Sequence, residues 1–188
     1  MSRYLPRYAV VAALAILSST VAAFAQTAAS PAPAVPAAPS TPTADVQRGY
    51  AGLKANILKA ADKMPAENYS YRPTPEIRTF ARVVNHVTEA QLHSCGAING
   101  TAPAANAVPP ETADKATIVA ALQASFAECD KAYAALTEAN MLETFSIGPA
   151  KRSRISLAWG NVSHDNEQYA TLALYMRLKG LPPPSSEK

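Results

Sequence analysis

Hydrophobic residues recur every three or four positions over four long stretches of the chain, which is the period of an α-helix. This pattern predicts helices at 43–64, 79–95, 114–136 and 156–179. Thr43 or Asp45 can cap the first helix, and Thr79 can cap the second. Pro65 ends the first helix, and Gly96 supplies the stop of the second. Four helices of this length predict an all-α fold, a four-helix bundle.

The connections between the predicted helices differ in composition. Prolines and turn formers fill 65–78, but the aromatic side chains of Tyr69 and Tyr71 need to be buried, so we expect an ordered loop there. Residues 98–112 are rich in Ala, Pro and Asn and predict a second loop. For 140–154 we expect at most a small extended segment and no sheet.

The first 42 residues have the composition of a leader and a tether. Arg3 and Arg7 precede an apolar run at 8–21, and the small-x-small motif at 23–25 is typical of a cleavage site, which predicts a signal peptide at 1–25. Residues 26–42 are mostly Ala, Pro, Ser and Thr and predict a disordered linker. We therefore expect a bundle domain at 43–185 in a periplasmic or secreted protein, with no stable membrane span after cleavage.

The charge of the chain gives no indication of a nucleic-acid partner. The formal net charge is +3, and removing the predicted leader with Arg3 and Arg7 leaves +1. Arg72, Arg152 and Arg154 either hold an anionic substrate at the mouth of the bundle or are solvated or paired with nearby carboxylates. A short basic run around Arg152 does not make the extended patch that a polyanion needs.

Two cysteines, Cys95 and Cys129, lie near the apolar stripes of the second and third helices. In a chain that enters an oxidising compartment they predict an intramolecular disulfide. Two buried thiols acting as small hydrophobic residues are the alternative. A reactive thiol ranks third, because neither cysteine has an adjacent histidine or basic pair.

The densest group of functional side chains lies on the last predicted helix, at 161–169. His164 and Gln168 are four residues apart and share one helical stripe, and His86 lies at the edge of an inward face of the second helix. Two imidazoles that converge can bind Zn(II), Ni(II) or Fe(II), although a catalytic zinc site usually has three protein ligands. Hydrogen bonding between the two histidines is the alternative.

Several motifs resemble the DinB-like superfamily, and more narrowly its exported bacterial branch. They are the loop YSYRPTPEIR at 69–78, Phe80, His86, the run HDNEQY at 164–169 and the run YMRLKGLPP at 175–183. The resemblance implies a four-helix bundle, often dimeric, with a divalent metal held by three histidines. In this chain His86 matches the first ligand, His164 matches the second, and Gln168 stands in the place of the third.

Characterised members of the family that the chain resembles are thiol-dependent transferases and isomerases or metal-dependent hydrolases. The resemblance therefore implies an exported protein with a degenerate site for Zn, Ni, Mn or Fe that binds or acts on a small molecule. The alternative is a non-catalytic, dimerising scaffold with a vestigial site. Trp159 lies off the main stripe of the last helix, and it marks either a dimer contact or a side chain covered by the preceding loop.

Overall fold

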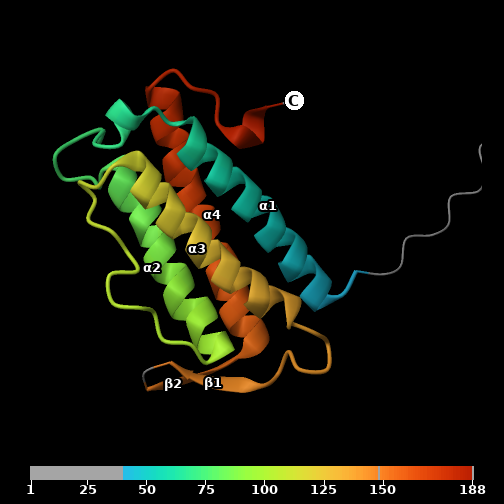
Figure 1. Ribbon diagram of the computed structural model, residues 1–188. Coiled ribbons are helices and arrows are strands. Elements are labelled where there is room, and N and C mark those ends of the chain that lie inside the picture. Colours follow the sequence, from blue (N-terminus) through green and yellow to red (C-terminus); the bar gives the residue numbers. More distant parts are fainter. Residues whose placement is uncertain (1–39, 148, 188) are drawn as a thin grey trace, which may run out of the picture. The chain divides into compact units, whose positions relative to one another are not determined.

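The computed structural model describes residues 40–147 and 149–187, and within them the chain folds into four helices, as predicted. The bundle consists of α1 (Pro42–Lys63), α2 (Phe80–Asn99), α3 (Lys115–Ala134) and α4 (Arg154–Leu178) (Figure 1). Two short 3₁₀ helices follow α1 and α4, at Ala66–Asn68 and Pro184–Ser186. The predicted signal peptide and the predicted linker up to residue 39 lie outside the described residues.

Each long helix begins at a side-chain cap. Thr79, predicted as a cap, accepts a hydrogen bond from the N–H of Arg82, and Ser153 caps α4 in the same way. At α1 the cap is Thr41 rather than Thr43 or Asp45, because the rigid ring of Pro42 suits the first helical position. The first helix therefore starts at the last residue of the predicted linker, one residue before the predicted start of the bundle domain at 43.

The predicted end of the second helix at Gly96 is wrong, since α2 continues to Asn99. Gly96 is helical, and a Cβ atom at this position would lie 2.8 Å from the backbone oxygen of Thr101. The missing side chain therefore permits the close return of the chain rather than ending the helix. Gly100, with φ of 69°, is the left-handed residue that terminates α2.

The segment before α4 contains a small sheet, contrary to the prediction. Strands β1 (Thr144–Ile147) and β2 (Ala150–Ser153) pair antiparallel, with Thr144 opposite Ser153 and Ile147 opposite Ala150. The hairpin lies beneath the end of α2 and the start of α4 (Figure 1). Each strand has only four residues, so the alternation of polar and apolar residues in β1 is too short to identify a strand from sequence.

The core of the bundle is made by the predicted apolar stripes. Tyr50 of α1 and Tyr133 of α3 stack with ring centroids 3.8 Å apart. The connection at 65–78 is ordered, as predicted: the hydroxyl of the buried Tyr69 donates to the carbonyl of Ala61 at 2.7 Å, and Tyr175 donates to that of Arg78 at 2.8 Å. The largest fully buried side chains of the described residues include Phe80, Phe126, Ile57, Met64, Ile118 and Leu172.

A disulfide joins α2 to α3. Cys95 and Cys129 are bonded, and both residues are completely buried. The predicted pairing is present, and the described residues contain no free cysteine. The bond fixes the C-terminal half of α2 against the middle of α3.

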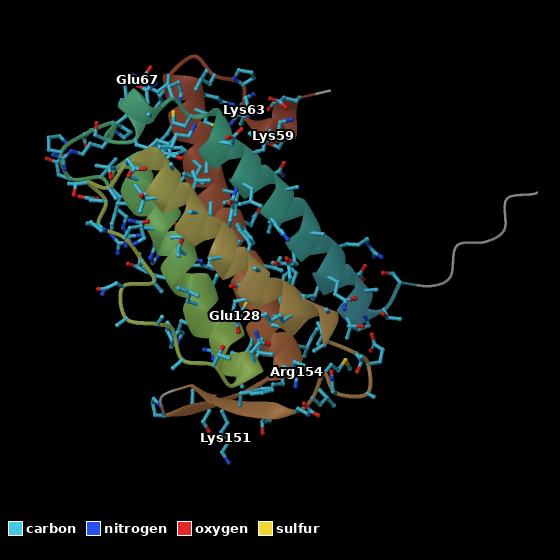
Figure 2. The ribbon with its side chains drawn as sticks, viewed as in Figure 1. Lys59, Lys63, Glu67, Glu128, Lys151 and Arg154 are labelled. Atoms are coloured by element: carbon cyan, nitrogen blue, oxygen red, sulfur yellow. A yellow bond between two sulfur atoms is a disulfide. The ribbon has the colours of Figure 1, made fainter. Side chains whose placement is uncertain are left out.

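The C-terminus folds back on the first helix. Glu187 forms ion pairs with Lys59 and Lys63 of α1 (Figure 2). The backbone N–H of Ser185 also donates to the hydroxyl of Tyr169 at 2.8 Å. None of the helices in the described residues is long and apolar enough to cross a bilayer.

Candidate metal centre

His86 and His164 meet across the interface between α2 and α4. Their Nε2 atoms are 3.2 Å apart, and their rings are inclined at 73°. Each side chain is about one quarter exposed, 27% for His86 and 26% for His164. The two histidines that the sequence singled out on separate helices are therefore brought together at a site that solvent can reach.

Charged neighbours orient the His86 ring. Its Nδ1 lies 3.3 Å from Oε2 of Glu89, one turn further along α2. Arg82 holds the same carboxylate through two hydrogen bonds of 3.0 Å each. Burial alone would raise the pKa of Glu89, but the hydrogen bonds from Arg82 and His86 outweigh it and lower the pKa. Glu89 is therefore an ionised acceptor beside the imidazole.

This arrangement determines which nitrogen of His86 is free. A carboxylate only accepts hydrogen bonds, so Nδ1 of His86 carries a proton, and in the neutral ring Nε2 keeps its lone pair. That lone pair points toward His164, where it accepts a proton from Nε2–H or serves as a metal ligand. A carboxylate on the far nitrogen of a ligating histidine is a common support of metal sites.

Asp165 supports the second histidine from inside the bundle. Its Oδ1 lies 3.8 Å from Nδ1 of His164, too far for a hydrogen bond, and both atoms are buried without a partner among the described residues. Asp165 is 1% exposed. Burial raises the pKa of its carboxyl, although the charge of a protonated His164 and hydrogen bonds from Gln91 and Asn161 act in the opposite direction.

A buried polar network extends from Asp165 into the core. Its Oδ2 accepts hydrogen bonds from Gln91 at 3.3 Å and from Asn161 at 3.2 Å. Gln91 in turn accepts from the hydroxyl of Ser125 on α3 at 2.7 Å, and Asn161 donates to the hydroxyl of Tyr133. The network therefore connects the α2–α4 interface around the histidine pair to α3.

Gln91 and Ser125 are the members of this network that sequence reasoning missed. Gln91 occupies the core stripe of α2 between Val87 and Cys95, and it is completely buried. A polar residue at an apolar position of a helical stripe was the available signal, because buried amides need partners.

The remaining candidate residues fall into two groups. Gln168 is buried at 8% exposure on α4, one turn beyond His164. Glu167 is exposed, and His93 lies on the surface two turns from His86. Arg154 pairs with Glu143 at 2.6 Å, and Arg72 donates to the carbonyl of Pro75 in its own loop. Neither of these two arginines joins the histidine pair.

The spacing of the two imidazoles fits a tetrahedral metal. Two bonds of about 2.0–2.1 Å to zinc, separated by a tetrahedral angle, place their nitrogen atoms about 3.3 Å apart. The Nε2 atoms of His86 and His164 are 3.2 Å apart. The described residues contain no cluster of three or more His, Cys, Asp or Glu side chains with metal-binding geometry, so Gln168 or a solvent molecule would have to complete the ligands.

Comparison with known proteins identifies the family of the chain. The model of the DinB superfamily matches residues 50–172, which is well over half of the sequence. A DinB-like protein from Bacillus cereus, known from its crystal structure, is similar with a TM-score of 0.61 and 15% identity, over 74% of this chain and 93% of that chain. At this identity the structural likeness concerns the fold. A comparison with curated proteins gives no match. The chain belongs to the DinB superfamily.

Proposed function

We propose that this protein binds a divalent metal through His86 and His164 and acts on a small molecule at that site. The observation that carries the proposal is the convergence of the two Nε2 atoms at 3.2 Å, with the His86 ring held from behind by Glu89. Gln168 or water would complete the ligands. A metal in this position would supply a Lewis acid, or would activate a bound thiol or water.

The residues around the pair have separate roles in this proposal. Glu89 and Arg82 keep the lone pair of His86 Nε2 directed at the site. Asp165 lies behind His164, with its Oδ1 3.8 Å from Nδ1 of the imidazole. The approach is open, because about one quarter of each imidazole is exposed to solvent.

Metal binding is tested on the mature protein after chelation and dialysis. We expect Zn(II), Ni(II), Mn(II) or Fe(II) to raise the melting temperature and to co-elute with the protein in elemental analysis. His86→Ala and His164→Ala should each abolish both effects, and His93→Ala, which removes an exposed histidine of α2, should not. Retention of metal by the His164→Ala variant would show that the ligands are assigned wrongly.

Gln168→His gives a gain-of-function test of the third position. A histidine there would restore a full set of three imidazoles, so we expect zinc affinity to rise at least tenfold. Glu167→His is the matched control, because it adds a histidine at the neighbouring position on the exposed side of α4. Equal gains in the two variants would contradict the assignment of Gln168.

A non-catalytic, dimerising scaffold is the second candidate, and the outer face of α4 favours it. Trp159, Leu174 and Leu178 are 59%, 52% and 53% exposed, so the preceding loop does not cover Trp159. Leu174 and Leu178 lie one helical turn apart, and Trp159 lies about 22 Å away along the same helix. Exposed large apolar side chains of this kind occur at interfaces. Light scattering of the metal-free protein should then give twice the monomer mass, and Trp159→Lys should return the mass to that of the monomer.

We also propose that the mature protein works outside the cytoplasm. The bond between Cys95 and Cys129 supports this location, because disulfides persist in oxidising compartments. Cell fractionation followed by N-terminal sequencing should find a chain beginning at Gln26. A cytoplasmic chain that keeps its first residues would contradict the proposal.

A further inference from the structure

A second polar pocket lies in the groove between α2 and α4, on the hairpin side of the histidine pair. It has a volume of about 290 Å³, and its lining includes His93 and Ser94 of α2, Arg152 of β2, and Ser156, Gly160 and Asn161 of α4. We call it the hairpin pocket. None of the residues that line it is acidic.

The hairpin pocket is close to the candidate metal centre. Gly160 precedes His164 by four residues, which is about one helical turn or 6 Å along α4. His93 follows His86 by seven residues on α2, and the two helices run in opposite directions (Figure 1). The step from His86 to His93 leads toward the C-terminus of α2, and the step from His164 to Gly160 leads toward the N-terminus of α4. Because the two helices are antiparallel, both steps lead from the histidine pair toward the hairpin. A small molecule can therefore occupy the pocket and reach the histidines.

The pocket carries positive charge and hydrogen-bond donors. Arg152 forms no ion pair within the part of the chain that the structure describes, whereas Arg154 is paired with Glu143. His93, Ser94 and Ser156 add N–H and O–H groups to the lining. A guanidinium presents a fork of donors that matches a carboxylate. The lining therefore favours an anionic group.

Asn161 narrows the class of ligand. Its Nδ2 donates to Asp165 and to the hydroxyl of Tyr133, which fixes the orientation of the amide. Asn161 is only 3% exposed, and the other atom of its amide, Oδ1, is buried without a partner among the described residues. A buried carbonyl without a donor is costly. A ligand with a hydroxyl or an amine beside its carboxylate can supply that donor.

We propose that the hairpin pocket binds the carboxylate of a small hydroxy- or amino-carboxylate whose other end reaches the His86–His164 pair. Arg152 binds the carboxylate, and Asn161 accepts a hydrogen bond from the neighbouring hydroxyl or amine. The inference rests on the proposed function for what happens at the histidines, but binding of the anion itself does not require the metal.

L-Malate and succinate are the probes, because they differ by one hydroxyl and share two carboxylates. Calorimetric titration of the metal-free mature protein should show saturable binding of L-malate, at least fivefold tighter than that of succinate. Equal affinities would overturn the role of Asn161. No binding of L-malate in a protein that still takes up zinc would overturn the pocket and leave the proposed function standing.

Arg152→Gln and Lys151→Gln form a matched pair. Both remove one cation from β2, but neighbouring strand residues face opposite ways, and Lys151 extends away from the helices (Figure 2). We expect Arg152→Gln to weaken L-malate binding at least tenfold and Lys151→Gln to change it less than twofold. Equal losses of L-malate affinity in the two variants would show that only the net charge matters, and would overturn the proposal.

Gly160→Phe blocks the pocket without changing its charge. A Cβ atom at Gly160 meets no atom within 4 Å, so a side chain has room to enter. We expect loss of L-malate binding with zinc binding retained. Gly52→Phe is the control, because Gly52 is a helical glycine of α1 that also meets nothing within 4 Å. Unchanged L-malate affinity in Gly160→Phe would overturn the proposed location.

Discussion

Helix α2 packs against α3 and α4 in two different ways. Its contacts with α3 are buried: a disulfide joins Cys95 to Cys129, and Ser125 donates a hydrogen bond to Gln91. Toward α4 it presents His86 to His164, with Asp165 behind the pair. The α2–α3 interface joins buried partners with a covalent bond, and the α2–α4 interface joins titratable groups that solvent partly reaches.

Unpaired polar atoms show the same division. Five buried side-chain atoms lack a hydrogen-bond partner in the described residues, and four of them belong to α4, on Arg154, Asn161, His164 and Asp165. None of the five belongs to α3. A buried polar atom without a partner lowers the stability of the fold. We therefore expect such atoms where a requirement other than stability keeps them in place. The comparison indicates that α3 serves the stability of the bundle and that α4 serves the site.

The largest effect should come from breaking the α2–α3 interface. We expect Cys95→Ala with Cys129→Ala to lower the free energy of unfolding by about 2–4 kcal/mol, because the unfolded chain gains conformational freedom. Urea denaturation with and without a reductant measures this effect. Zinc affinity should change by less than a factor of about three. A large loss of zinc affinity with unchanged stability would contradict the comparison, because it would make the α2–α3 interface the one that supports the candidate site.

Asp165 tests the α2–α4 interface. Asp165→Ala removes the acceptor of Gln91 and Asn161, and leaving buried donors unpaired should cost about 1–3 kcal/mol. Asp165→Asn keeps an acceptor and removes a buried charge, so its stability at neutral pH should equal or exceed that of the wild type. Chemical denaturation compares the three proteins. A destabilised Asn variant would show that the charge itself stabilises the interface.

The smallest effect is expected from neutralising Glu128, which precedes Cys129 on α3 and contacts the end of α2 (Figure 2). Hydrogen bonds from Thr101, Lys131 and Asn99 lower the pKa of Glu128 to about 2. A depressed pKa stabilises the fold above the ordinary pKa of a glutamate, and this contribution is lost as the pH falls toward about 2. We therefore expect Glu128→Gln to cost about 1–2 kcal/mol at pH 7 and progressively less below about pH 4.5.

Urea denaturation of wild type and Glu128→Gln between pH 7 and pH 3 checks this dependence. Glu67→Gln serves as the control, because Glu67 is exposed and forms no ion pair within the described residues (Figure 2). A difference between wild type and Glu128→Gln that stays constant over this range would show that the carboxylate charge is not the cause.

The helices could be predicted from the sequence because each depends on a local period and a local cap. Thr79 and the apolar stripe after it are sufficient to place the start of α2. The end of α2 was misplaced because Gly96 has two possible roles, a stop and a site of close approach, and only the return of Thr101 distinguishes them. The hairpin was missed because the pairing between β1 and β2 is not a local signal, and an alternation over only four residues does not identify a strand.

The candidate site was predictable only in part. His86 and His164 were found because they match motifs of a family. The members of the network around Asp165 come from three helices, and no sequence spacing connects Gln91 or Asn161 to Ser125. Arg152 reaches the hairpin pocket because it lies on β2, a strand that was not predicted. The sequence therefore indicated the cation but not its place in the fold. Local signals identify the candidate ligands, and tertiary contacts identify what surrounds them.

The position of the disulfide along the chain has a consequence for biogenesis. Cys95 and Cys129 are 34 residues apart, and both precede α4. During synthesis, all residues of α2 and α3 are added before those of α4, so both cysteines are present before the C-terminal helix emerges. His164 reaches His86 only when α4 docks onto this preformed pair. The candidate centre is therefore assembled last, and a chain truncated before α4 would keep its crosslink and lack the site.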